Sequence, residues 1–85
     1  MKIALDHDGT YSRDKPFWDA FCELAKQHGH EVLCLTRRYE HEPVAMPVPV
    51  HYTAREYKLQ YAGRRNMQID IWIDNEPLDI VPLFQ

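Results

Sequence analysis

Three short apolar segments of this chain run directly into polar residues, and this pattern constrains the fold more than any other feature. Ile3-Ala4-Leu5 is followed by Asp6, Val32-Leu33-Cys34-Leu35 by Thr36, and Ile71-Trp72-Ile73 by Asp74. Their apolar residues are consecutive rather than alternating, which is typical of strands that are covered on both faces. We therefore predict buried strands over residues 2–6, 31–36 and 69–74.

The segments between these strands favour crossover helices. Asp14 followed by Pro16 is typical of a helix start, so a helix is expected over 15–28. Thr53-Ala54-Arg55-Glu56 has the pattern of a capping box, which predicts a second helix over 54–64.

The remaining segments complete a small α/β domain. Residues 48–52 contain Pro49 and are expected to form an edge strand or an extended segment, although the connection from Thr36 is near the lower limit of about a dozen residues for a parallel crossover. Residues 78–84 are expected to form a short helix or strand. The order predicts one domain over 1–85, a three-layer Rossmann-like fold with a mostly parallel sheet of about four strands and no cap domain.

Composition narrows the function classes. A chain of 85 residues has a marginal core, so a metal, a partner or a second copy is expected to add stability. No apolar run is long enough to span a membrane, and Cys22 and Cys34 are interpreted as reduced core thiols, so we expect a cytoplasmic protein. The formal net charge of −3 argues against non-specific binding of duplex nucleic acid, so any phosphate chemistry should be local.

Polar residues follow three of the predicted strands at their carboxyl ends, where open parallel sheets bind their ligands. Asp6 and Asp8 are two residues apart, about 7 Å between Cα atoms, and can address one site. Asp74 would add a third carboxylate from a neighbouring strand end. Three acids repel one another unless a cation lies between them, and an oxygen-only ligand set suits Mg²⁺.

The residues Ile3-Ala4-Leu5-Asp6-His7-Asp8-Gly9-Thr10 resemble the first motif of the haloacid dehalogenase-like (HAD) phosphatases, an apolar strand that runs into Asp-x-Asp-Gly-Thr. Thr36 is similar to the second motif of that family, Lys58 to the third, and Ile71-Trp72-Ile73-Asp74-Asn75 to the fourth. Arg55 is a competing candidate for the third motif. The first motif is specific and the others are individually weak, but their order agrees along nearly the whole chain.

The resemblance implies a role for each matched residue. Asp6 would be the nucleophile that forms an aspartyl-phosphate, and Asp8 the general acid and base, with a pKa raised by its acidic neighbour. The phosphoryl group would be held by the turn after Asp6 and by side chains at the other strand ends, a set that comprises Gly9, Thr10, Thr36, Arg37 and Lys58. Magnesium would be bound by Asp6, Asp8 (through its carbonyl), Asp74 and Asn75.

Two positions depart from the family pattern. His7 stands where that family mostly has an apolar or aromatic residue, and it is expected to point to the other side of the strand. Asn75 stands where many members carry a second acid, so metal affinity is expected to be weaker, with Asn75 orienting a water. The chain has no room for a cap segment, so a phosphorylated small molecule, a nucleotide, a nucleic-acid terminal phosphate and a phosphoprotein all remain admissible substrates.

Two other function classes stay open. A non-catalytic phosphate- or nucleotide-binding module would keep the fold without efficient turnover. A receiver-like phosphoacceptor domain would also use clustered acids with Thr and Lys, but its acceptor normally ends a later strand. Zinc, dinucleotide and Walker-type sites lack their motifs in this sequence.

Overall fold

The protein folds around a four-stranded parallel sheet, as predicted from the three apolar segments. The structure is a computed structural model of the chain and describes residues 1–83. The sheet order is β3-β2-β1-β4 and all neighbouring strands are parallel. The strands are β1 (Lys2–Leu5), β2 (Glu31–Thr36), β3 (Val50–Tyr52) and β4 (Ile71–Ile73).

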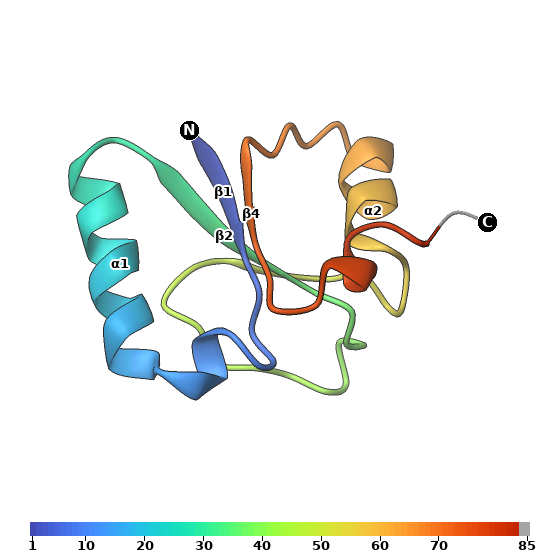
Figure 1. Cartoon of the computed structure of the whole chain (residues 1–85), viewed down its shortest axis with the longest axis horizontal. Coiled ribbons are helices and arrows are strands. Elements are labelled where there is room, and N and C mark those ends of the chain that lie inside the picture. The colour runs from blue at the N-terminus through green and yellow to red at the C-terminus, as the bar shows by residue number, and fades with distance from the viewer. Residues whose placement is uncertain (84–85) are drawn as a thin grey trace.

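The strand order places the chain reversal beside β1. From β1 the chain moves one way to β2 and β3, and it then returns to β4 on the other side of β1 (Figure 1). Ile3 of β1 is therefore in register with Val32 of β2 and with Ile71 of β4. In sheets of this kind the crevice lies beyond the carboxyl ends of the two strands at the reversal. These are β1 and β4, which end just before Asp6 and Asp74.

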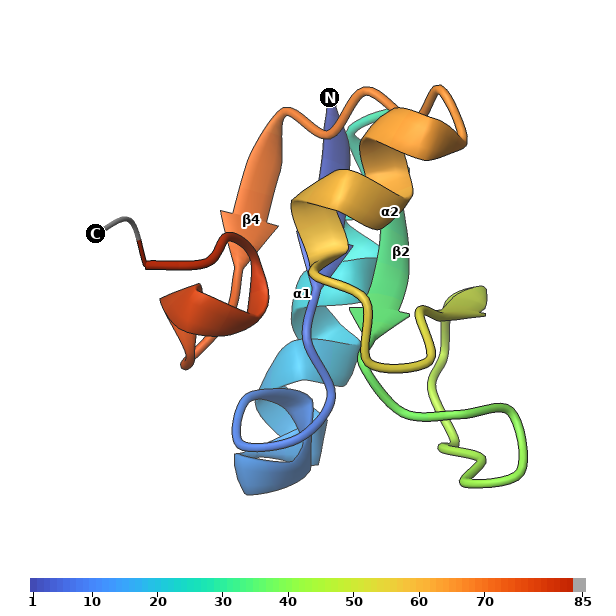
Figure 2. The same ribbon diagram turned by 90° about the vertical axis from the view of Figure 1, so that its right-hand side faces the viewer.

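Two helices cover opposite faces of the sheet, which gives the three layers (Figures 1 and 2). Helix α1 spans Lys15–Gln27 and α2 spans Lys58–Arg64. Side chains of β1 alternate between the faces, so Ile3 and Leu5 pack with Ala25 of α1, while Ala4 packs with Tyr61 of α2. The sheet is covered on both sides, in agreement with its consecutive apolar residues.

Helix α1 follows its predicted bounds closely. The Asp14 side chain accepts a hydrogen bond from the Phe17 N–H at 3.4 Å, and Pro16 lies in the first turn. Gly29 follows the helix with φ +80°, a left-handed conformation that glycine adopts without steric cost. The predicted start signal is therefore present in the structure, and Gly29 ends the helix.

Helix α2 begins later than predicted, because the expected capping box does not form. Ala54 and Arg55 have φ of 55° and 72°, and their N–H groups donate to the carbonyls of Arg38 and Arg37. The Thr53 hydroxyl donates to the Glu56 carbonyl at 2.7 Å instead of accepting from a helix N–H. These contacts join the segment to the chain that leaves β2, so the helix begins at Lys58.

The other segments are shorter or less regular than expected. The connection 37–49 contains no helix, and β3 and β4 each cover only three residues of the predicted strands. Short 3₁₀ helices follow β1 (η1, Tyr11–Arg13) and β4 (η2, Pro77–Asp79). The expected element over 78–84 overlaps η2 only at its start, and its last residue lies outside the described part of the chain.

Both cysteines are buried free thiols, as expected. Within residues 1–83 no helix is long and apolar enough to cross a membrane.

Candidate functional site

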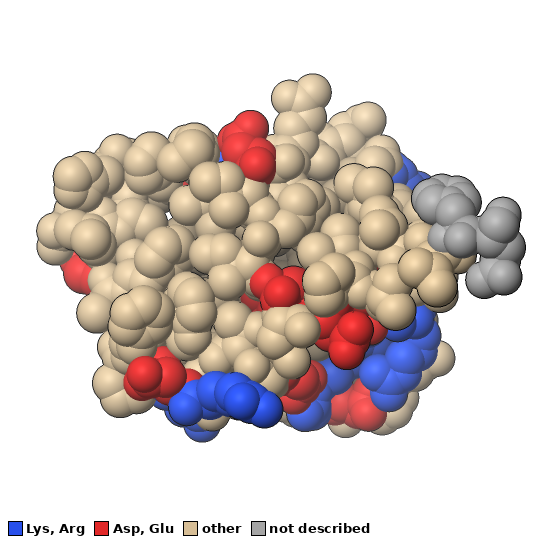
Figure 3. Space-filling model, viewed as in Figure 1, with Lys and Arg blue, Asp and Glu red and all other residues tan. Residues whose placement is uncertain are grey.

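The carboxyl ends of β1, β2 and β4 lie at one edge of the sheet, below the strands in Figure 1, so the polar residues that follow them are at this edge. Figure 3 shows acidic side chains recessed near the middle of this face, with basic side chains beside them. Asp6, Thr36 and Lys58 are all buried there. The predicted convergence of the strand ends is therefore present.

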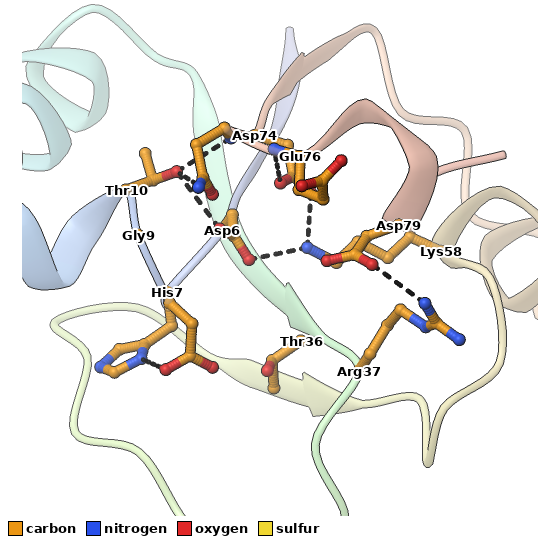
Figure 4. Close-up of polar contacts among 12 residues, drawn as sticks. Asp6, His7, Gly9, Thr10, Thr36, Arg37, Lys58, Asp74, Glu76 and Asp79 are labelled. Carbon is orange, nitrogen blue, oxygen red and sulfur yellow. Dashed lines mark hydrogen bonds and ion pairs between the residues drawn. The ribbon is translucent and has the colours of Figure 1, made fainter.

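Lys58 lies at the centre of this group (Figure 4). Its Nζ is 2.7 Å from Asp6 Oδ1 and 2.5 Å from Asp74 Oδ2, and the three side chains are only 2%, 6% and 2% exposed. The late start of α2 makes this possible, because Lys58 is the first residue of the helix and points to the strand ends. Two buried carboxylates thus share one buried ammonium.

Burial and pairing act in opposite directions on these charges. Burial alone would lower the pKa of Lys58, but its hydrogen bonds to Asp6 and Asp74 outweigh burial and raise that pKa. Burial raises the pKa of Asp6, and the contacts with Lys58 and Thr10 only partly oppose it. Because one ammonium serves two acids, Lys58 keeps its proton while the Asp6 carboxylate is under-compensated.

The second oxygen of Asp6 contacts the loops that follow β1 and β4. The Thr10 hydroxyl donates to Asp6 Oδ2 at 3.2 Å, and the Asn75 main-chain N–H donates to Thr10 Oγ1 at 3.1 Å. The Asn75 side-chain amide also turns inward. With its nitrogen inward it lies 2.9 Å from Asp6 Oδ2, 3.0 Å from the Asp8 carbonyl oxygen and 3.2 Å from Thr10 Oγ1, and its two N–H groups can donate to the first two.

Gly9 makes room for that amide. A Cβ at this position would lie 2.4 Å from the Asn75 side-chain amide, and Gly9 has φ +84°. The main chain of the turn is engaged within the turn itself, since the Gly9 N–H donates to Ser12 Oγ at 2.9 Å and the Thr10 N–H to the His7 carbonyl at 3.3 Å. These two N–H groups, predicted to hold phosphoryl oxygens, therefore already have partners.

Asp8 differs from its expectation. The Arg38 guanidinium donates two hydrogen bonds to the Asp8 carboxylate, from Nε to Oδ2 and from Nη2 to Oδ1, each at 2.8 Å. The Asp8 side chain is 52% exposed. The Arg38 hydrogen bond is the main cause that lowers the pKa of Asp8 to about 2. The prediction of a raised pKa was wrong, because the nearest charge to this carboxylate is a cation rather than another acid.

His7 contacts Asp8, with Nδ1 at 3.2 Å from Oδ1, and its ring lies against Tyr11. Thr36 is buried at the end of β2, and its Oγ1 accepts the Arg38 N–H at 3.3 Å. Figure 4 shows Thr36 on the side of Asp6 away from Thr10.

Arg37 and Arg55 are held away from the two buried acids. Arg37 donates to Asp79 Oδ1 at 2.9 Å and to the Arg55 carbonyl at 2.6 Å, and its guanidinium lies over the Tyr57 ring. Arg55 pairs with Glu42. Of the two candidates for the third motif, Lys58 is the one that lies between the acids.

Sequence reasoning missed two partners within this group. No role of its own was predicted for Arg38 from the sequence, yet its guanidinium binds the Asp8 carboxylate. Asp79 fixes Arg37, and no local pattern marks it, because the two residues are 42 positions apart.

The oxygen atoms available to a cation are fewer than expected. Within residues 1–83, no group of three or more His, Cys, Asp or Glu side chains is arranged to hold a metal. Asp74 is already engaged by Lys58 and, through Oδ1, by the Glu76 N–H at 2.9 Å. The remaining candidates are Asp6 Oδ2, the Asp8 carbonyl and the Asn75 amide oxygen.

This remaining set fits magnesium in spacing. The inward atom of the Asn75 amide is 2.9 Å from Asp6 Oδ2 and 3.0 Å from the Asp8 carbonyl oxygen. Adjacent ligands of an octahedral Mg²⁺ at 2.0–2.1 Å are separated by about 2.9 Å. If the amide oxygen is the inward atom, two of the three spacings among these oxygens therefore match adjacent corners of one octahedron.

A shallow pocket of about 330 Å³ opens beside this set, lined by Gly9, Thr10, Asp74 and Asn75 and by Arg13 and Trp18. It adjoins the loops that follow β1 and β4, so a small ligand can approach the acids from solvent.

Comparison of the chain with protein-family models, curated proteins and solved structures finds no match. The interpretation of the site therefore depends on its geometry and chemistry.

Proposed function

We propose that this protein is a magnesium-dependent phosphohydrolase that cleaves phosphomonoesters through an aspartyl-phosphate on Asp6. The observation that carries the proposal is the buried Lys58 ammonium between Asp6 and Asp74, at the reversal point of a parallel sheet. Such a site offers a carboxylate nucleophile next to a fixed positive charge, which phosphoryl transfer requires.

Asp6 supplies the attacking oxygen in the first step. An Asp6 carboxylate oxygen forms a bond to phosphorus while the bond from phosphorus to the leaving-group oxygen breaks. Lys58 would neutralise part of the charge on the transferring group, and the Thr36 hydroxyl would donate to a phosphoryl oxygen. Magnesium, held by Asp6, the Asp8 carbonyl and Asn75, would supply further positive charge at the phosphoryl oxygens.

Asp8 carries the proton in both steps. It gives a proton to the leaving-group oxygen, and it then takes one from the water that attacks the aspartyl-phosphate, which releases inorganic phosphate and restores Asp6. Its low pKa in the free protein comes from Arg38, whose side chain is 35% exposed. When a substrate phosphate binds, transfer of the Arg38 guanidinium to that phosphate would remove the cause of the low pKa, so Asp8 would take up a proton from solvent and then give it to the leaving-group oxygen.

The openness of the site sets the substrate class. The acids lie at the sheet edge with a shallow pocket beside them, and no segment of residues 1–83 forms a separate cap domain over them. Both a phosphorylated small molecule and the terminal phosphate of a nucleic acid are therefore admissible substrates. Assembly into a homo-oligomer and a cytoplasmic location stay predictions.

The test is hydrolysis of p-nitrophenyl phosphate with and without Mg²⁺, by wild type, Asp6→Asn and Asp8→Asn. Glu40→Gln is the matched control, because Glu40 is an exposed acid outside the site. We expect magnesium-dependent turnover that both site variants lose, and a phosphoryl adduct on Asp6 in acid-quenched wild type by mass spectrometry. Turnover that persists in Asp6→Asn, or an adduct on another acid, would refute the mechanism.

The low pKa of Asp8 favours one other candidate, a phosphate-binding module without turnover. In that case Asp8 stays paired with Arg38 and provides no proton. Calorimetric binding of inorganic phosphate without any hydrolysis would identify the module, and an adduct on an acid other than Asp6 would favour a receiver-like phosphoacceptor.

A further inference from the structure

Both ends of the Asn75 side-chain amide have close neighbours, although the residue as a whole is exposed. One end lies against Gly9, where an added Cβ would come within 2.4 Å. The other end faces three oxygen atoms, Asp6 Oδ2, the Asp8 carbonyl oxygen and Thr10 Oγ1, at 2.9, 3.0 and 3.2 Å. The amide atom that points inward therefore decides whether these oxygen atoms receive hydrogen bonds from Asn75.

In the absence of a cation, the hydrogen-bond donors around the Asn75 amide decide which of its atoms points inward. Neither Asp6 Oδ2 nor the Asp8 carbonyl carries a proton to give, and the Thr10 hydroxyl has one proton, for which Asp6 Oδ2 also competes at 3.2 Å. An inward oxygen would thus face two acceptors, whereas an inward nitrogen donates to both. Without a cation, hydrogen bonding therefore favours the orientation with the nitrogen inward.

A cation reverses this preference. The inward atom, Asp6 Oδ2 and the Asp8 carbonyl oxygen are spaced at 2.9 and 3.0 Å, close to the edge of a magnesium octahedron, which is about 2.9 Å. The ion can use the corner at Asn75 only if that atom is oxygen, because the lone pair of an amide NH₂ nitrogen is delocalised into the C=O group and does not bind Mg²⁺. The same position is taken either by an N–H donor or by a metal ligand.

We propose that Asn75 determines the cation affinity of this site: its amide nitrogen takes the place of the ion, and binding requires the amide to turn its oxygen inward. This proposal rests on the divalent cation of the proposed function. Magnesium must displace two hydrogen bonds, one of them to a carboxylate, so the metal-free site is already satisfied. An aspartate at this position has no N–H to donate and presents oxygen in either orientation.

The test compares wild type, Asn75→Asp and Asn66→Asp by titration with MgCl₂ after treatment with a chelator. Asn66 is the only other asparagine and is exposed, so Asn66→Asp adds the same charge away from the site. We expect Asn75→Asp to bind Mg²⁺ about tenfold to a hundredfold more tightly than wild type, because hydrogen bonds to a charged group shift an equilibrium by about that factor. Asn66→Asp should match wild type.

A second readout follows the amide itself in ¹⁵N-labelled protein. The two asparagine side-chain NH₂ signals are assigned by the loss of one in each variant. In metal-free wild type the Asn75 NH₂ protons should exchange slowly with water, and saturating Mg²⁺ should shift them and speed their exchange. The Asn66 signal should not change.

The outcomes separate this inference from the proposed function. If wild type binds Mg²⁺ while the Asn75 NH₂ signal stays unchanged, or if Asn75→Asp binds no more tightly than Asn66→Asp, the inference is refuted and the metal site stands. If neither wild type nor Asn75→Asp binds Mg²⁺, the cation of the proposed function is refuted together with the inference. An Asp6 phosphoryl adduct tests the nucleophile independently of both.

Discussion

Replacement of Lys58 by methionine should destabilise the fold far more than any exposed lysine change. Lys58 is 2% exposed, and its ammonium lies 2.7 Å from Asp6 and 2.5 Å from Asp74. Methionine fills a similar volume, so the main loss is the positive charge between two buried carboxylates.

The magnitude follows from the burial of all three groups. Removing one partner of a buried ion pair costs about 3–5 kcal/mol, since it leaves an uncompensated charge. A domain of 85 residues has a free energy of unfolding of about 4–13 kcal/mol, so the variant keeps only part of its stability. At about 4–8 °C per kcal/mol for a domain of this size, the melting temperature should fall by about 15 °C or more.

Thermal and urea unfolding at neutral pH, with a chelator present, measure this loss. Lys26→Met is the matched control, because Lys26 is exposed on α1. A triple variant with Lys58→Met, Asp6→Asn and Asp74→Asn separates charge from packing and should recover at least half of the loss, because it leaves no buried charge unpaired. The reasoning fails if Lys58→Met costs less than about 1 kcal/mol, the upper range for exposed pairs, or if the triple variant recovers nothing.

Two further predictions concern the loop after β1. Gly9→Ala should lower the free energy of unfolding by more than about 1–2 kcal/mol, the cost of a left-handed alanine, because the added Cβ also displaces Asn75. Gly63→Ala in α2 should instead raise the free energy of unfolding by about 0.5–1 kcal/mol. Urea unfolding of both variants tests this, and equal effects would contradict it. The hydrogen bond to Asp19, helped by burial, raises the pKa of Tyr11 from 10.0 to about 12, so ultraviolet titration should show one tyrosine ionising last that is missing in Tyr11→Phe. Because this pKa is raised in the fold, the stability from Tyr11 is complete below pH 10 and is lost as the pH rises towards 12; an unchanged alkaline unfolding curve in Tyr11→Phe would count against this assignment.

The strand ends could be predicted from the sequence because their signals are local. The consecutive apolar residues of 3–5 and 32–35 indicate strands buried on both faces, and polar residues at the ends of parallel strands must meet at one edge of the sheet. Asp6, Thr36 and Asp74 were therefore placed together from the sequence, and the structure shows that edge.

The start of α2 could not be predicted in the same way. The capping box of Thr53 and Glu56 is a local signal, but the N–H groups of Ala54 and Arg55 find partners on the chain after β2, which lies 16 to 18 positions earlier. These tertiary hydrogen bonds outweigh the local preference. The position of Lys58 between the acids depends on this late helix start.

The pKa of Asp8 could not be predicted from the local sequence either. The spacing of Asp6 and Asp8 suggested two interacting acids, but Asp8 turns to Arg38, which is 30 positions away. A pKa depends on the nearest charge in space, and the sequence does not show that Arg38 rather than the adjacent Arg37 supplies the charge next to Asp8.

The edge position of β4 has a consequence for how this protein is assembled. Asp6 and Lys58 are 52 positions apart, and Asp74 joins them only when the three residues of β4 dock on β1. Contacts between distant chain segments form late in folding, because loop closure must precede them. A chain in which β4 has not docked on β1 would therefore lack the full charge arrangement. A ligand that requires all three charged residues would then bind only the fully folded chain.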